Sequence, residues 1–158
     1  GFQLYNYETA KIVQTANGKV PIFDGIPYDA FTKIYIKVGL NEMGWANEEK
    51  FEELYAEFIE KLREKEPHAI IYVHALLPVT ASKSETDPAH SNQKIAARNE
   101  ALKEFAKKNK CYFIDIASVV SDETGALKSE MTTDGIHLVS KYMSVWLDYL
   151  KTHAILVR

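Results

Sequence analysis

The chain has 158 residues, of which 46% are hydrophobic and 26% are charged, a composition typical of a globular domain that buries a core. Its formal net charge of −3 gives no basic surface for nucleic acid or for an anionic membrane. The single cysteine, Cys111, excludes a disulfide within the chain, and its apolar neighbours predict a buried structural thiol. We expect one domain over residues 1–158, with no nucleic-acid partner and no membrane span.

A hairpin and a strand open the predicted structure. In residues 11–22, apolar residues flank Asn17-Gly18, a dipeptide that accepts the positive φ angles of a tight primed turn. The sequence therefore predicts a small β-hairpin. A strand is expected over residues 33–38, and it stops at Gly39.

A long amphipathic helix and a buried strand come next. Asn47 is suited to cap the helix, whose apolar side chains recur at spacings of three and four residues until Glu66-Pro67 ends it. Residues 69–77 form a nearly continuous apolar run, which predicts a strand buried on both faces. His74 within this run is expected to be a hydrogen-bonded core residue.

The second half of the chain repeats this alternation. We expect a polar loop, a helix in which Asn99 finds a buried partner, a third strand, a turn-rich stretch and a last helix. These elements are expected at residues 80–90, 91–108, 111–116, 121–133 and 140–153. The order predicts an α/β fold, a three-layer α/β/α sandwich with a mostly parallel, flavodoxin-like sheet. In such sheets the ligand crevice lies beyond the carboxyl ends of the strands.

Gly39-Leu40-Asn41-Glu42 lies at one of these carboxyl ends. Gly39 allows a sharp turn with close backbone approach, and the side-chain amide of Asn41 can donate to the oxyanion of a tetrahedral intermediate. The alternative is that Asn41 only caps a turn.

Asp134-Gly135-Ile136-His137 lies just before the last helix. A carboxylate three residues from an imidazole can bind one ring N–H and leave the other ring nitrogen to take a proton from a nucleophile. The alternative is a helix-entry aspartate next to a surface histidine.

Together these blocks resemble the SGNH (GDSL-like) serine ester hydrolases. IYIKVGLNE resembles the family's strand and Gly-x-Asn-Asp block, and DGIH resembles its closing Asp-x-x-His block. The resemblance runs from about Lys33 to His153. KIYIKVGLNEMGW and AIIYVHALLPVT are similar to bacterial members described as GDSL-like lipases or acylhydrolases.

The resemblance implies a role for each matching residue. His137 would be the general base and then the acid, and Asp134 would orient it. Asn41 would donate to the oxyanion from its side chain, and Gly1 would do so from its backbone N–H. No cofactor is expected, and no metal site either, because the histidines show no metal-ligand spacing with one another or with the cysteine.

Three further residues would contact the substrate. Gly39 belongs to the oxyanion loop, Trp45 follows that loop, and Leu77 ends the second predicted strand. For Trp45 and Leu77, packing against neighbouring elements is an equally good interpretation.

The sequence departs from the family pattern at two places. Glu42 stands where the family has Asp, and no Gly-Asp-Ser block occurs. Ser82, Ser84 and Ser91 lie in or beside the polar loop, where surface or helix-capping roles are expected.

The resemblance therefore implies that the first strand of the sheet, with its serine, lies upstream of these residues. Without that strand, the sheet would have an unpaired central edge. This edge would be filled by the missing N-terminal segment or by a second copy of the chain.

The function predicted from the sequence is hydrolysis of a small acyl ester by a Ser-His-Asp triad, as in a GDSL-like lipase/acylhydrolase or a carbohydrate O-acyl esterase. Residues 1–158 alone are expected to be inactive. A transferase using another alcohol would have the same residues. The alternative class is a non-catalytic flavodoxin-like binding module, although no glycine-rich strand-to-helix turn is present to hold a nucleotide phosphate. The compartment is left open.

Overall fold

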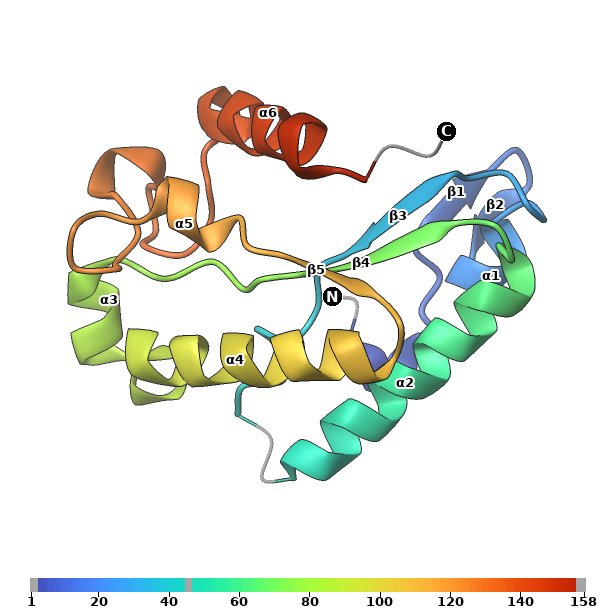
Figure 1. The fold of residues 1–158 in the computed structure, drawn as a ribbon, viewed down its shortest axis with the longest axis horizontal. Coiled ribbons are helices and arrows are strands. Elements are labelled where there is room, and N and C mark those ends of the chain that lie inside the picture. Colours follow the sequence, from blue (N-terminus) through green and yellow to red (C-terminus); the bar gives the residue numbers. More distant parts are fainter. Residues whose placement is uncertain (1–2, 45–46, 156–158) are drawn as a thin grey trace.

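The computed structural model describes residues 3–44 and 47–155 of the chain. A parallel three-stranded sheet lies between two helical layers, with α2 and α4 on one face and α6 on the other (Figure 1). The strands are β3 (Lys33–Ile36), β4 (Ile70–His74) and β5 (Tyr112–Ile114), in the order β3-β4-β5. The predicted α/β class and parallel sheet are confirmed.

The hairpin forms where it was predicted, from β1 (Val13–Thr15) and β2 (Gly18–Val20). The expected primed turn is wrong, because Gly18 has φ +108° whereas Asn17 has no positive φ. Thr15 pairs with Gly18, and its hydroxyl donates to the Gly18 carbonyl at 2.7 Å and accepts from the Asn17 N–H at 3.2 Å. The Thr15 side chain therefore closes the loop with a positive φ only at the glycine, which lacks the Cβ that penalises it.

Two short helices accompany the hairpin. They are the 3-10 turn η1 (Leu4–Asn6) and α1 (Ile22–Gly25). The long helix α2 (Glu48–Lys65) follows β3, and the Asn47 side chain accepts a hydrogen bond from the Lys50 N–H at 3.0 Å, as predicted for its N-cap. Its apolar stripe is buried against the sheet and comprises Phe51, Tyr55, Phe58, Ile59 and Leu62.

β4 is buried on both faces, as predicted. Ile71 and Val73 belong to the core cluster beneath α2 and α4. Because successive side chains of a strand alternate, Tyr72 and His74 face the α6 layer. Tyr72 stands in register between Tyr35 and Tyr112, with ring centroids 4.6 and 5.7 Å away, so three tyrosines cross that face of the sheet.

α4 (Asn92–Lys108) has Ser91 as its N-cap, and the Ser91 hydroxyl accepts from the Lys94 N–H at 3.5 Å. Asn99 finds the partner that was expected. Its amide accepts from the Leu76 N–H at 2.7 Å and donates to the Leu76 carbonyl at 2.9 Å, in the segment that continues β4.

Two stretches are more ordered than the sequence indicated. The polar loop before α4 contains α3 (Ala81–Thr86) and the 3-10 turn η2 (Pro88–His90). After β5 come α5 (Ala117–Val120) and η3 (Ser129–Met131). These elements are too short to carry an apolar repeat, and this explains why they were missed.

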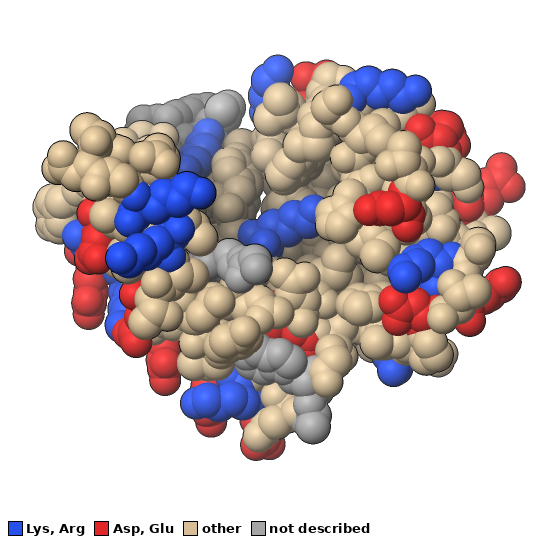
Figure 2. Space-filling view, turned by 180° about the vertical axis from the view of Figure 1, so that it is seen from behind, with Lys and Arg blue, Asp and Glu red and all other residues tan. Residues whose placement is uncertain are grey.

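The chain closes with η4 (Ser140–Tyr142) and α6 (Met143–His153). Beneath α6 lies a second core cluster, which comprises Leu77, Ile116, Val120, Leu127 and Met131. Acidic and basic side chains are interspersed on the face of the molecule seen in Figure 2, which is hollowed near its middle. In the described part of the chain, no helix combines the length and apolar character needed to cross a bilayer.

The outer edge of β3 is open. Within residues 3–44 and 47–155, β3 pairs with β4 and with no other strand. An apolar groove of about 320 Å³ lies beside it, lined by consecutive residues from Ile34 to Val38 and by Ile12, Phe31 and Leu62. Because side chains of both pleat faces line the groove, it follows the strand's edge.

Candidate active site

Asp134 and His137 are joined by a side-chain hydrogen bond in the loop before η4. The carboxylate Oδ2 lies 2.7 Å from the imidazole Nδ1, and Oδ1 accepts from the backbone N–H groups of His137 at 2.8 Å and Ile136 at 2.9 Å. The His137 backbone N–H, then its imidazole, then the Ile136 N–H hold the pKa of Asp134 well below its usual range. The carboxylate is therefore ionised at neutral pH.

This arrangement assigns the two ring nitrogens of His137 different roles. An ionised Asp134 beside Nδ1 favours the tautomer that carries its proton there. Nε2 is then the nitrogen that can accept a proton. The His137 side chain is 80% exposed, so a reacting group can approach it from solvent.

The loop that carries the pair is docked on the start of α3. Gly135 has φ +83°, and its carbonyl accepts from the Thr80 N–H at 2.9 Å. A Cβ at Gly135 would lie 2.9 Å from the Thr80 hydroxyl and 3.1 Å from the Lys83 Cβ. Sequence reasoning did not single out Gly135 or Thr80, although the Asp-Gly dipeptide was a signal for a backbone turn.

The Gly39–Glu42 turn is held by a buried carboxylate. Glu42 is 1% exposed, and its two oxygens accept from the backbone N–H groups of Gly39 at 3.1 Å and Leu4 at 2.9 Å. Gly39 has φ +122°, and a Cβ there would come within 3.1 Å of the Phe51 ring. Glu42 thus ties the turn to η1, and Asn41 is exposed on this turn.

Both loops rest on the same core cluster. Leu40 and Met43 on either side of Asn41, and Ile136 next to His137, pack against the cluster beneath α2 and α4. The structure therefore joins Asp134 to His137 directly and seats the Asn41 turn on the same packed layer. Convergence of the Asn41 amide and the His137 ring on one reacting atom stays a prediction.

The other predicted site residues have different outcomes. Gly1 and Trp45 lie outside the described residues. Leu77 is 7% exposed within the second core cluster, and a contact of this side chain with substrate stays a prediction. Among the serines, Ser91 caps α4, which confirms a capping role for it, and the Ser84 hydroxyl accepts from the Asn92 N–H at 2.9 Å.

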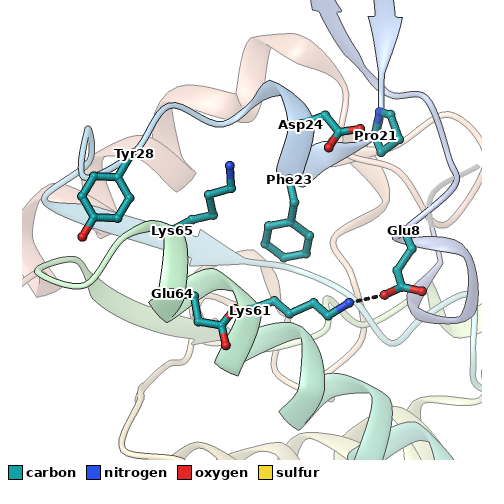
Figure 3. A pocket seen from close by; sticks show the side chains of 8 residues that line it. All are labelled: Glu8, Pro21, Phe23, Asp24, Tyr28, Lys61, Glu64 and Lys65. Atoms are coloured by element: carbon teal, nitrogen blue, oxygen red, sulfur yellow. Dashed lines mark hydrogen bonds and ion pairs between the residues drawn. The ribbon is translucent and has the colours of Figure 1, made fainter.

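A separate hollow of about 540 Å³ lies near the hairpin, between α1 and α2 (Figure 3). Lys61 and Lys65 of α2 line it together with Asp24 and Tyr28, and Lys61 pairs with Glu8. None of the predicted site residues contributes to its lining. Across the described ranges, the histidine, cysteine and acidic side chains form no group able to hold a metal ion.

The fold and the site define an α/β protein with a parallel sheet and an Asp–His pair in a loop at its rim. The model of the GDSL-like Lipase/Acylhydrolase family matches residues 10–141. The chain therefore belongs to the GDSL-like lipase/acylhydrolase family.

Solved structures share this fold. A Streptococcus pneumonia protein named for platelet activating factor is 26% identical, with a TM-score of 0.69 over 78% of this chain and 60% of its own. A GDSL-like lipase from Bacteroides thetaiotaomicron is 23% identical, with a TM-score of 0.59 over 77% of this chain and 60% of its own. For phospholipase A1 from Streptomyces albidoflavus the identity is 15% and the TM-score 0.62, over 82% of this chain and 72% of that one.

The chain thus spans 60% of the length of the first of these structures. Among curated proteins, none matches its sequence.

Proposed function

We propose that this chain supplies the general base, its orienting carboxylate and an oxyanion donor to an ester hydrolase that works by acyl transfer to serine. The observation that carries the proposal is the Asp134–His137 pair, in which an ionised carboxylate binds Nδ1 of an exposed imidazole. Membership in the GDSL-like lipase/acylhydrolase family supports it.

The proposed steps follow from the roles of the two ring nitrogens. Nε2 of His137 takes the proton of the serine hydroxyl as its oxygen attacks the ester carbonyl. Asp134 stabilises the resulting imidazolium, and the Asn41 amide donates to the oxyanion. His137 then gives its proton to the leaving alcohol, which leaves an acyl-enzyme. Water, deprotonated by the same imidazole, releases the carboxylic acid and restores the serine.

We place the serine on a segment outside residues 1–158 that pairs with the open edge of β3. The sequence contains no Gly-Asp-Ser block. Within the described part of the chain no strand pairs with the open edge of β3, and Ile12 and Phe31 beside it are 42% and 47% exposed. A strand lying there would complete hydrogen bonds along β3 and bury the apolar groove.

Labelling of the complete protein with a fluorophosphonate probe tests the proposal. The probe is expected to modify one serine, and peptide mapping is expected to place it outside residues 1–158. Labelling within residues 1–158 would refute the placement, as would a dimer of residues 1–158 that labels and hydrolyses p-nitrophenyl acetate. Absence of any labelling would favour the non-catalytic binding module.

A further inference from the structure

Two β4 side chains on the face toward α6, those of Tyr72 and His74, attach this helix to the sheet. The Trp146 indole N–H donates to His74 Nε2 at 2.7 Å, and the two rings meet edge to face at 5.3 Å. Beyond the end of α6, the Ile155 N–H donates to the Tyr72 hydroxyl at 2.7 Å. The helix is therefore held near its first turn and just past its last one.

The donor and acceptor in the His74–Trp146 hydrogen bond are fixed, because the other ring nitrogen of His74 also has a hydrogen-bond partner. Nδ1 lies 2.7 Å from the carbonyl oxygen of Ala75, so it carries the proton and donates. Nε2 of the neutral ring is then an acceptor, which matches the donor-only indole of Trp146. His74 is 1% exposed, so water does not compete for this bond.

α6 depends on such a contact more than the other long helices do. None of its residues is buried, in contrast to α4, which buries five side chains. It packs on the second core cluster through the partly buried Trp146 and Tyr149. Loss of the bond to His74 would leave mainly this partial packing to fix the orientation of the helix.

Trp146 also reaches the strand that leads to the Asn41 turn. The Lys37 ammonium lies 5.6 Å from the centroid of the indole ring, and Lys37 directly follows β3 and precedes Gly39 by two residues. On its other side, α6 follows the Asp134–His137 loop, with Leu138 bridged to Thr132 and the Val139 N–H donating to the Met131 carbonyl at 2.9 Å.

We propose that Trp146, through its hydrogen bond to His74, is a positioning residue that sets the Asp134–His137 loop relative to the Asn41 turn. The inference rests on the proposed function for its effect on rate, but its structural part stands separately. Trp146 connects α6, which follows the Asp134–His137 loop in the chain, with β4 and with the end of β3.

The test compares the complete protein with its Trp146→Phe and His74→Phe variants and with the double variant. Hydrogen exchange is measured at the backbone N–H groups of Ile136 and His137, which donate hydrogen bonds to the Asp134 carboxylate. A net neutral hydrogen bond corresponds to about 3- to 10-fold, so protection at these two amides is expected to fall by that factor in each single variant. The double variant is expected to lose no more than either single one, because both remove the same bond. Amides of the β3–β4 ladder should keep their protection.

Tyr149→Phe is the control, since it alters another aromatic residue of α6 that packs on the same cluster. It is expected to leave protection at Ile136 and His137 unchanged. In Trp146→Phe, kcat for p-nitrophenyl acetate should fall by the same 3- to 10-fold while KM is unchanged.

Equal loss of protection throughout the protein would reduce Trp146 to a general stabilising role and overturn the inference, as would unchanged protection at the two amides. If the complete protein hydrolyses no ester but the selective loss of protection is seen, the proposed function fails and the positioning contact stands.

Discussion

Glu42 accepts a hydrogen bond from the backbone N–H of Leu4 across 38 positions of sequence. With its other oxygen it accepts from Gly39, so one buried side chain ties η1 to the turn that presents Asn41. The longer Glu side chain, where the family pattern has Asp, makes this double contact.

Replacing Glu42 with Gln is expected to lower the free energy of unfolding by about 1–3 kcal/mol. An amide has one oxygen, so one of the two backbone N–H groups would face an NH₂ group in a buried site. Urea denaturation measures the change. Glu52→Gln on the exposed side of α2 is the control and should shift the free energy of unfolding by no more than about 0.5 kcal/mol. Equal stability of the two variants would contradict the role of Glu42.

Gly135 and Gly125 form a matched pair for a second test, because both have φ +83°. A Cβ at Gly135 would meet Thr80 and Lys83, whereas nothing lies within 4 Å of a Cβ at Gly125. Substitution by Ala therefore adds the same backbone strain at both sites, about 1 kcal/mol, and a steric clash only at Gly135. We expect Gly135→Ala to lose about 1–2 kcal/mol more than Gly125→Ala in urea denaturation.

Esterase activity should separate the same two variants. Displacement of the Asp134–His137 loop by the clash should lower kcat in Gly135→Ala, while Gly125→Ala should retain the parent rate. A parent rate in both variants would show that docking of the loop on Thr80 does not matter for the chemistry.

The free energy of unfolding should decrease as the pH is lowered, because of His74. Burial lowers its pKa from 6.5 to about 4; the Ala75 carbonyl opposes this shift and the charge of Lys37 adds to it. Between these two values the unfolded chain binds a proton that the folded protein does not. The free energy of unfolding should therefore be highest above pH 6.5 and decline by about 3 kcal/mol as the pH falls to 4.

Urea denaturation at pH 7.0, 5.5 and 4.5 in the parent and in His74→Gln checks this dependence. The variant has no titratable group at position 74 and should lose much of the decline. An identical decline in both proteins would assign the pH dependence to other groups.

The sequence predicted the elements that depend on local patterns. α2 and α4 followed from apolar repeats and from the caps Asn47 and Ser91, and β4 followed from a nearly continuous apolar run. The Asp134–His137 pair was equally local, because both residues lie on one turn. Composition and spacing therefore sufficed for the sheet, its long helices and half of the candidate site.

Long-range contacts could not be predicted in the same way. The bonds from Trp146 to His74 and from Glu42 to Leu4 join residues with no shared periodicity, and only the folded chain brings them together. α3 escaped prediction because Thr80 caps a helix of six residues, too short to show a hydrophobic face. The same helix positions Gly135, so part of the site was missed with it.

The most direct test of the central claim compares two His–Asp pairs of this chain in the complete protein. His68 lies 2.9 Å from Asp29 and is 81% exposed, much like His137, but it precedes β4 at the opposite end of the sheet. Initial rates of p-nitrophenyl acetate hydrolysis are measured for His137→Ala and His68→Ala at equal folded concentration. We predict that kcat falls by at least about 10³-fold in the first variant and stays at the parent value in the second. Parent-like turnover in His137→Ala, or an equal loss in both variants, would contradict the assignment of His137 as the catalytic base.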